Sequence, residues 1–331
     1  MTRKPKPTRQ TISEFSQLYF KLNLKCSNPG THHQYALAIK GFTQHLGHEA
    51  TTDDLQDDVV TGWIRSMLDR GLAAITAKER AGRIQTLWNW LARRRVVEVF
   101  PTFEKPRPPE TMPVSLTEKQ LTRLFQSAAK ERRDVAGIPA GLWWASFFAF
   151  VWNTGERKAA ALAVRVEWVD FERQQCVIPP HVRKGGRKFA VYDLWPETIP
   201  VLRAAIMVNP ARDLVWPWDK CRESYYTTYN RILRDAGIPV TRRYKTHSLR
   251  CTHATMKHVL AGDATRALGH SDPATTNKYY IDPTMLKRDE VKMFIPWQQS
   301  AVVPTIPTQP SNQPEPKRPS IAAEVEATSW L

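Results

Sequence analysis

The sequence contains few cysteines and no apolar run long enough to cross a membrane. Its four cysteines, Cys26, Cys176, Cys221 and Cys251, lie far apart and form no C-x-x-C pair. This spacing argues against a structural zinc site and a disulfide framework, and it indicates a reducing compartment. The strongest apolar stretch, residues 137–152, is shorter than a membrane span, so we expect a buried helix there.

Two further absences narrow the class of protein. No apolar signal core follows the basic residues 1–10, which argues against secretion. No glycine-rich loop of the Walker type occurs, so nothing in the sequence indicates a bound nucleotide.

What the chain has in excess is positive charge. Its formal net charge is +16, and the excess of lysine and arginine lies in residues 1–110 and 111–295 but not in 296–331. Such a charge favours a polyanionic partner, nucleic acid above all. A basic protein that is merely soluble remains the alternative.

The first hundred residues carry four helical patterns, in which apolar side chains recur every three or four positions. They span residues 11–24, 31–47, 51–71 and 76–95. Thr11 or Ser13 could cap the first helix, and Gly47 and Gly71 could end the second and third. The fourth carries basic residues on its other face and at its end, which form either a solvated face or a contact with phosphates.

Proline and capping signals divide the rest of the chain. Residues 100–113 hold five prolines, which excludes a regular helix and indicates a linker. Ser115 followed by Glu118 resembles a capping box, and two strand-like runs flank Gly185-Gly186, a dipeptide suited to a tight hairpin. We predict a mainly α fold with a small β-hairpin in the second of two domains. The predicted parts are a basic tail (1–10), a helical first domain (11–99), the linker (100–113), a second domain (114–298) and a disordered proline-rich tail (299–331).

Four separated sites in the second domain could carry chemistry. Arg157 follows a Thr-Gly turn at a helix start, where an arginine can grip a phosphate with two donors. Lys184 stands at the expected hairpin tip and could donate a proton to a leaving alkoxide. His247 and Arg250 share one helix face, and Tyr279 lies near the end of a short helix that begins at Asp272-Pro273. Each site alone reads more simply as ordinary surface or packing residues.

Together and in this order, these sites resemble the tyrosine recombinase, or phage integrase, family. The family pattern is T-G-x-R, a lysine on a β-hairpin, H-x-[LF]-R, L-G-H and a tyrosine nine residues after that histidine. The matching residues here are Thr154–Arg157, Lys184, His247–Arg250, Leu268–His270 and Tyr279. Five elements in the right order are specific, although each alone is weak.

The resemblance implies a site-specific DNA recombinase or integrase, in which residues 11–99 form a core-binding DNA domain and residues 114–298 form the catalytic domain. Tyr279 would attack a DNA phosphodiester, forming a 3′-phosphotyrosyl link and freeing a 5′-hydroxyl. The two arginines and two histidines of the pattern would stabilise charge on the phosphoryl oxygens, and Lys184 would protonate the leaving oxygen. Tyr280 would be a packing residue, since successive helical residues point about 100° apart. Neither a metal nor another cofactor is implied.

The resemblance also implies partners and a location. We expect double-stranded DNA clamped between the two domains, a homotetramer on synapsed sites that is monomeric in solution, no contact with a membrane, and a cytoplasmic protein associated with the nucleoid when it acts. The residues expected to contact DNA are Arg83, Arg93, Arg94, Arg183, Arg187, Lys188, Arg242 and Arg243.

Two departures from the family pattern stand out. Ala160 occupies a position where family members often carry an acidic residue that braces the site, and Glu156 or Glu167 could substitute for it. The segment between Arg250 and His270 is shorter than in the family. The alternatives are a telomere resolvase, a type IB topoisomerase, a DNA-binding protein of this fold without strand cleavage, or a basic structural protein of the nucleoid.

Overall fold

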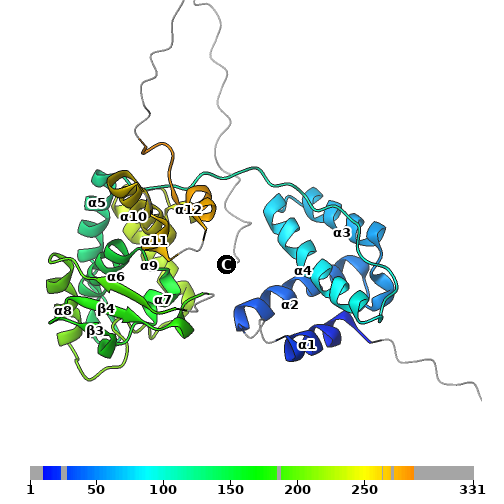
Figure 1. The fold of residues 1–331 in the computed structure, drawn as a ribbon, viewed down its shortest axis with the longest axis horizontal. Coiled ribbons are helices and arrows are strands. Elements are labelled where there is room, and N and C mark those ends of the chain that lie inside the picture. The colour runs from blue at the N-terminus through cyan, green and yellow to red at the C-terminus, as the bar shows by residue number, and fades with distance from the viewer. Residues whose placement is uncertain (1–9, 24–27, 185–187, 263, 270–271, 287–331) are drawn as a thin grey trace, which may run out of the picture. The chain divides into compact units, whose positions relative to one another are not determined.

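The computed structural model describes residues 10–23, 28–184, 188–262, 264–269 and 272–286. Within these ranges the chain is mostly helical with two small antiparallel sheets (Figure 1). This confirms the expected mainly α fold with a small β component. None of the helices in the described ranges is long and apolar enough to cross a membrane.

The N-terminal segment contains the four expected helices. They are α1 (Ile12–Leu22), α2 (Pro29–Leu46), α3 (Asp57–Asp69) and α4 (Ala74–Arg93). Their apolar faces meet in a buried cluster that includes Phe42, Trp63, Ile84, Leu87 and Trp88. Each fully buried large apolar side chain contributes roughly 1.5–3 kcal/mol, so this cluster is what holds the four helices together.

The helix ends follow the capping signals in the sequence, with one difference. Thr11 begins α1 in a capping box: its hydroxyl accepts the N–H of Glu14 at 3.1 Å, and its own N–H donates to the Glu14 carboxylate at 2.8 Å. Gly47 ends α2 with a φ of 76°, a left-handed conformation that favours glycine. Helix α3 begins at Asp57, later than expected, because a separate 3₁₀ helix, η2 (Thr52–Asp54), precedes it.

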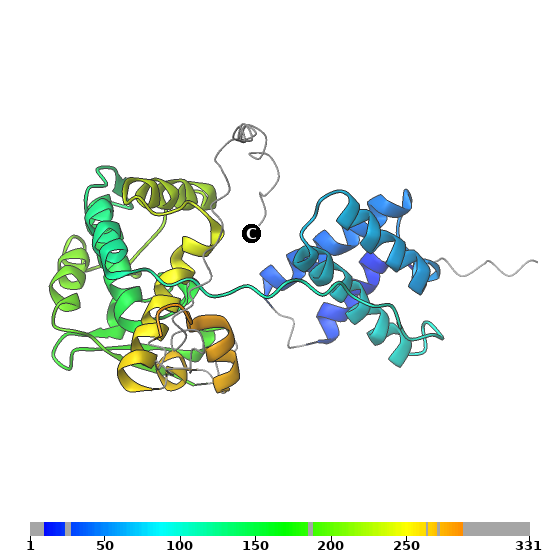
Figure 2. The ribbon, with the colours of Figure 1, turned by 90° about the horizontal axis from the view of Figure 1, so that it is seen from above.

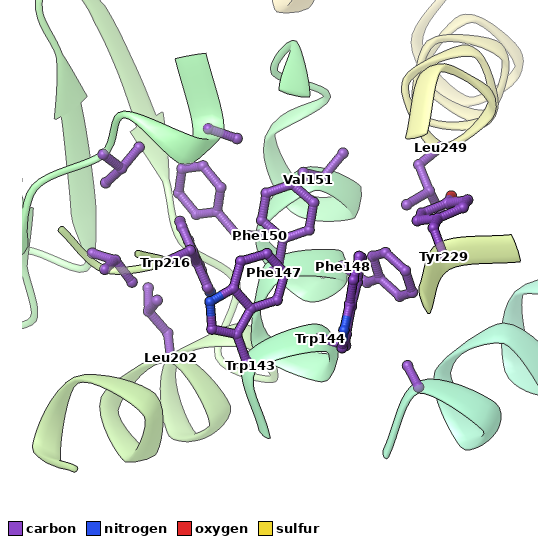
Figure 3. Close-up of a cluster of buried hydrophobic side chains, with 14 of the residues drawn as sticks. Trp143, Trp144, Phe147, Phe148, Phe150, Val151, Leu202, Trp216, Tyr229 and Leu249 are labelled. Atoms are coloured by element: carbon purple, nitrogen blue, oxygen red, sulfur yellow. The ribbon is translucent and has the colours of Figure 1, made fainter. Parts of the chain in front are cut away.

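The C-terminal segment is built around helix α6, the apolar stretch expected to be buried. Its side chains Trp143, Trp144, Phe147 and Phe148 are buried among aromatic neighbours that include Trp216 (Figure 3). The helices of this segment are α5 (Glu118–Ala129), α6 (Ala140–Thr154), α7 (Lys158–Leu162), α8 (Thr198–Met207), α9 (Arg222–Asp235), α10 (Thr246–Ala261), α11 (Thr265–Leu268) and α12 (Pro273–Tyr280), with short 3₁₀ helices η3 (Val166–Trp168), η4 (Pro180–Val182) and η5 (Arg242–Tyr244). Helices α5, α8 and α10 pack against α6, and α10, α11 and α12 lie side by side (Figures 1 and 2).

The sheets are smaller and less hairpin-like than expected. Strands β1 (Asp134–Val135) and β2 (Ile138–Pro139) pair with each other, and β3 (Val169–Asp170), β4 (Gln175–Ile178) and β5 (Ala190–Asp193) form the second sheet in that order. Strands β4 and β5 pair antiparallel on either side of Gly185-Gly186, as expected, but their last pair joins Ile178 to Ala190, so the connection between them is long. The turn at Gly185-Gly186 lies outside the described residues and stays a prediction. Pro179 and Pro180 end β4 early, since proline has no N–H to donate to a neighbouring strand.

The cap of helix α5 is not the expected Ser115 but lies two residues later. Thr117 caps α5, and Gln120 completes the capping box. Ser115 is instead buried: its N–H donates to the Asp282 carboxylate at 2.8 Å, and its hydroxyl lies 3.0 Å from that of Thr255. These bonds tie the start of the C-terminal segment to α10 and to the residues that follow α12.

Residues 100–113 form neither helix nor strand, as their prolines predict. Most of residues 1–10 and all of 299–331 lie outside the described residues. The exact boundaries of the two domains stay a prediction.

Candidate functional site

Helix α10 is the support of the candidate site. Its residues 246–255 are all buried except His247. The hydroxyl of Thr252 accepts the N–H of Leu116 at 2.8 Å, which fixes the helix to the start of the C-terminal segment. A helix packed on most of its surface can hold a charged side chain in one orientation.

Arg250 is the charged side chain that α10 holds. It is only 1% exposed, and a buried cation is tolerated only where other groups compensate its charge. Its guanidinium donates to the carbonyl oxygen of Gly155 at 2.5 Å and to that of Leu268 at 3.2 Å. Burial and the nearby positive charge of Arg157 lower the pKa of Arg250, which indicates that the two guanidinium groups lie close together.

The turn that carries Arg157 packs directly against α10. Gly155 ends α6 with a φ of 63°, and a Cβ atom there would lie 2.6 Å from Cδ2 of His253. Only glycine satisfies both constraints. His253 is held in turn, because its Nδ1 lies 2.7 Å from the carbonyl oxygen of Trp152. The Thr-Gly turn therefore brings half-buried Arg157, which caps α7, to the vicinity of Arg250.

His247 joins the two arginines. His247 is exposed to solvent on one side, but the surrounding protein partly desolvates its imidazole. This desolvation and the charges of Arg250, Arg157 and Arg242 lower the pKa of His247. The neutral imidazole therefore predominates near neutral pH. Arrival of an anion between these cations would favour the protonated form, because it would remove the repulsion that keeps the pKa low.

The two adjacent tyrosines face different surroundings. The Tyr280 ring is 8% exposed, and its centroid lies 4.9 Å from Cζ of Arg250 and 5.2 Å from the centroid of the His247 imidazole. Tyr279 is 55% exposed. The side chain next to the Arg250–His247 pair is thus Tyr280, while the predicted nucleophile, Tyr279, points to solvent. Tyr280 is buried, as a packing residue would be, but it packs on the site itself.

The structure describes only one of the two other predicted catalytic residues, Lys184. Lys184 is exposed in the connection between β4 and β5. His270 lies outside the described residues, as does Arg187 among the predicted DNA-binding residues. The structure therefore brings together Arg157, His247 and Arg250, and gives no distance from them to His270.

The predicted DNA-binding residues fall into two groups. Arg83 contacts Glu79 at 3.4 Å and Arg94 lies over the Trp90 ring at 4.6 Å, yet both remain on the surface. Arg183 differs, because its guanidinium is turned into the protein and its side chain is only 11% exposed; its contact with DNA stays a prediction. The other four described residues of this set are exposed to solvent: Arg93, Lys188, Arg242 and Arg243.

One basic cluster escaped the sequence analysis. The Tyr226 ring is surrounded by Lys158, Arg222 and Lys245, whose cationic atoms lie 4.5, 5.9 and 4.8 Å from its centroid. Burial alone would raise the pKa of the Tyr226 hydroxyl, but hydrogen bonds and charges from Lys158 and Arg222 lower it. Three cations around one ring repel one another and attract an anion. The sequence did hold a signal for this cluster, because Lys158 directly follows Arg157 and Lys245 directly precedes Thr246, so both lie next to the predicted motifs.

Sequence comparison decides the family. The sequence model of the phage integrase family matches residues 115–285, more than half of the chain. The chain belongs to the phage integrase family. This stretch holds every residue of the five-part catalytic pattern.

Known relatives are consistent with this membership. A putative tyrosine recombinase XerC from Pseudomonas aeruginosa is 27% identical over 168 residues, which cover 47% of this chain and 39% of that protein. The chain thus spans about two fifths of the length of this curated relative. The XerH site-specific recombinase bound to its difH substrate matches with a TM-score of 0.61 and 17% identity over 82% of both chains. A lambda integrase dimer bound to a COC′ core site matches with a TM-score of 0.64 and 16% identity, covering 88% of this chain and 85% of that one. At these identities the two structures show a common fold.

Proposed function

We propose that this family member is a site-specific DNA recombinase or integrase that cleaves and rejoins DNA through a 3′-phosphotyrosyl link. The observation that carries the proposal is the convergence of Arg157, from the turn after α6, with His247 and Arg250 of α10, beside the helix that bears Tyr279 and Tyr280. Grouped cations repel one another in the free protein and stabilise a phosphoryl group that gains charge during reaction.

The proposed reaction balances without a further reactant. The Tyr279 hydroxyl gives its proton to solvent and attacks phosphorus, so that a Tyr279–phosphate bond forms and the bond from phosphorus to the 5′-oxygen breaks. Lys184 gives its proton to that 5′-oxygen, which leaves as a hydroxyl. Rejoining is the reverse, with a 5′-hydroxyl attacking the phosphotyrosine. Since Tyr279 points to solvent in the free protein, the reaction requires it to turn toward Arg250.

The proposed substrate is duplex DNA. The cluster of Lys158, Arg222 and Lys245 around Tyr226 supports this proposal. It offers a second place where a phosphate could bind, and Lys158 directly follows Arg157 in the chain. With it we propose a clamp of two domains on DNA, a tetramer on synapsed sites that is monomeric in solution, and a location in the cytoplasm at the nucleoid.

The decisive experiment traps the covalent intermediate. A nicked suicide substrate loses the 5′-hydroxyl fragment after cleavage, so an active enzyme accumulates as a protein–DNA adduct that survives detergent. We expect the adduct with the unchanged protein, and a loss of at least about 10³-fold in Tyr279→Phe with DNA binding retained, since the nucleophile itself is removed.

Tyr280→Phe is the matched control, because it removes the neighbouring hydroxyl and keeps the ring over Arg250. Loss of the adduct in Tyr280→Phe but not in Tyr279→Phe would assign the nucleophile to Tyr280. DNA binding without any adduct would favour the alternative, a DNA-binding protein that has this fold and does not cleave.

A further inference from the structure

A buried carboxylate lies behind the proposed phosphate site. The Glu156 side chain is fully buried, and its pKa is lowered in spite of that burial. Burial alone would raise this pKa; hydrogen bonds from the Arg157 N–H and the Tyr192 hydroxyl and the charges of Arg183 and Arg250 lower it. An ionised carboxylate in the interior persists only where donors and cations compensate it. Glu156 is therefore a charged element of the site and not a chance surface residue of the T-G-x-R turn.

The two oxygens of Glu156 bind two different parts of the catalytic segment. Oε1 accepts the N–H of Arg157 at 2.7 Å and lies 3.8 Å from Nη1 of Arg250. Oε2 accepts from Nε of Arg183 and from the hydroxyl of Tyr192, both at 2.7 Å. One side of the carboxylate thus faces the arginines proposed to bind phosphate, and the other faces the β4–β5 connection.

Arg183 passes this constraint to two neighbouring elements. It directly precedes Lys184, the proposed general acid, in the chain. Its guanidinium also lies against the turn after α11, where a Cβ atom on Gly269 would come within 3.2 Å of Nη2 of Arg183. A rigid Glu156–Arg183 pair therefore limits where the backbone at Lys184 can lie.

The position that carries an acidic residue in many family members is occupied here by an uncharged residue, Ala160. Ala160 is 2% exposed and apolar, and Glu167, the other candidate, is exposed on η3. We propose that Glu156 is the positioning residue of this site: its carboxylate holds Arg250 in the orientation that receives the phosphate and, through Arg183, holds the loop that presents Lys184. The proposal rests on the proposed function, since it concerns the same reaction.

The test compares two leaving groups. A substrate with sulfur in place of the bridging 5′-oxygen releases a thiolate, which needs no proton from Lys184, because a thiol is far more acidic than an alcohol. We expect Glu156→Gln to slow single-turnover cleavage of the oxygen substrate by about 100-fold, the scale of a small misplacement of catalytic groups. On the sulfur substrate the rate loss of Glu156→Gln should be smaller. The part caused by a misplaced Lys184 should disappear, and the part caused by a misplaced Arg250 should remain. Lys184→Ala, which lacks only the acid, should recover almost fully.

Folding and binding are measured on the same samples. Glu156→Gln should keep its helical circular dichroism and bind DNA within about threefold of the unchanged protein. If it does not fold, Arg183→Gln keeps the contact between Glu156 and Arg250 and removes only the contact to the loop, so its defect should disappear on the sulfur substrate.

Two outcomes would overturn the proposal. One is cleavage by Glu156→Gln at the rate of the unchanged protein. The other is that Glu156→Gln and Arg183→Gln each lose as much cleavage rate on the sulfur substrate as on the oxygen substrate. Absence of any adduct with the unchanged protein would instead refute the proposed function.

Discussion

Helices α10 and α12 lie against each other, yet they differ in how firmly the protein holds them. Residues 246–255 of α10 are buried with a single exception, whereas α12 buries only Thr276 and Tyr280. Two hydrogen bonds from α10 to α12 are long: the Thr255 hydroxyl donates to the Tyr280 carbonyl at 3.3 Å, and Cys251 Sγ lies 3.8 Å from the Tyr279 carbonyl oxygen.

The difference separates two tasks of the proposed reaction. In the proposed reaction, His247 and Arg250 receive the phosphate, and both sit on a helix that is part of the core, so they are in place before DNA arrives. The groups that attack it sit on a helix of two turns with little buried surface, which can rotate or shift at small cost in free energy. We expect substitutions on α10 to be severe and substitutions on α12, apart from the nucleophile, to be mild.

The largest effect should come from Arg250→Lys. A lysine keeps the charge but cannot donate to Gly155, to Leu268 and to a phosphate at once, since it lacks the planar fork of arginine. We expect the rate of adduct formation on a suicide substrate to fall by about 10³-fold.

The matched substitution on α12 is Lys278→Ala, which removes a surface cation 3.4 Å from Glu110. Such exposed pairs contribute little, so its rate should stay within about twofold. A loss of less than tenfold in Arg250→Lys, or equal losses in both variants, would break the contrast between the two helices.

Much of this architecture was predictable from the sequence, because the relevant signals are local. Apolar periodicity located α1, α2 and α4, and the continuous apolar stretch 137–152 located α6; Asp272 caps α12 as expected, accepting the N–H of Ala274 at 2.9 Å. Membership of the phage integrase family was predictable for another reason: each motif of the family pattern is short and the motifs occur in a fixed order.

The remainder depends on contacts between distant residues. Ser115 and Thr117 are both plausible caps, and only the distant Asp282 makes Ser115 a buried partner instead. Glu156 could not be chosen over Glu167 without knowing that Arg183 would turn inward. Spacing from His270 names Tyr279, but it does not say which tyrosine faces the arginines in the free protein.

A second prediction concerns the stability of α10. Burial lowers the pKa of His253 to about 4, although its bond to the Trp152 carbonyl opposes this. Between the ordinary histidine pKa, about 6.5, and about 4, the unfolded chain binds a proton that the folded chain does not. The free energy of unfolding therefore falls as the pH falls through this window, by about 2.5 kcal/mol between pH 7.5 and 4.5.

Urea unfolding of the unchanged protein and of His253→Gln at the two pH values isolates this contribution from that of the carboxylates. The variant should lose about 2.5 kcal/mol less than the unchanged protein over the interval. Identical losses would mean that His253 titrates normally and that α10 is less tightly packed at this point than the contacts indicate.

The smallest effect is expected from the ring that covers Arg250. The Tyr280 ring lies 4.9 Å from Cζ of that arginine, and a buried contact of this kind contributes about 1–2 kcal/mol. In the proposed reaction, the phosphate and Tyr279 would have to displace this ring from Arg250 before cleavage. Tyr280→Leu should therefore raise the rate of adduct formation, by about fivefold at saturating DNA, because the occupied site no longer has to be vacated. Tyr280→Phe keeps the ring and should leave the rate within about twofold. A slower reaction in Tyr280→Leu with normal DNA binding would mean that the ring orders α12 for attack, and α12 would then belong with α10 to the preassembled part of the site.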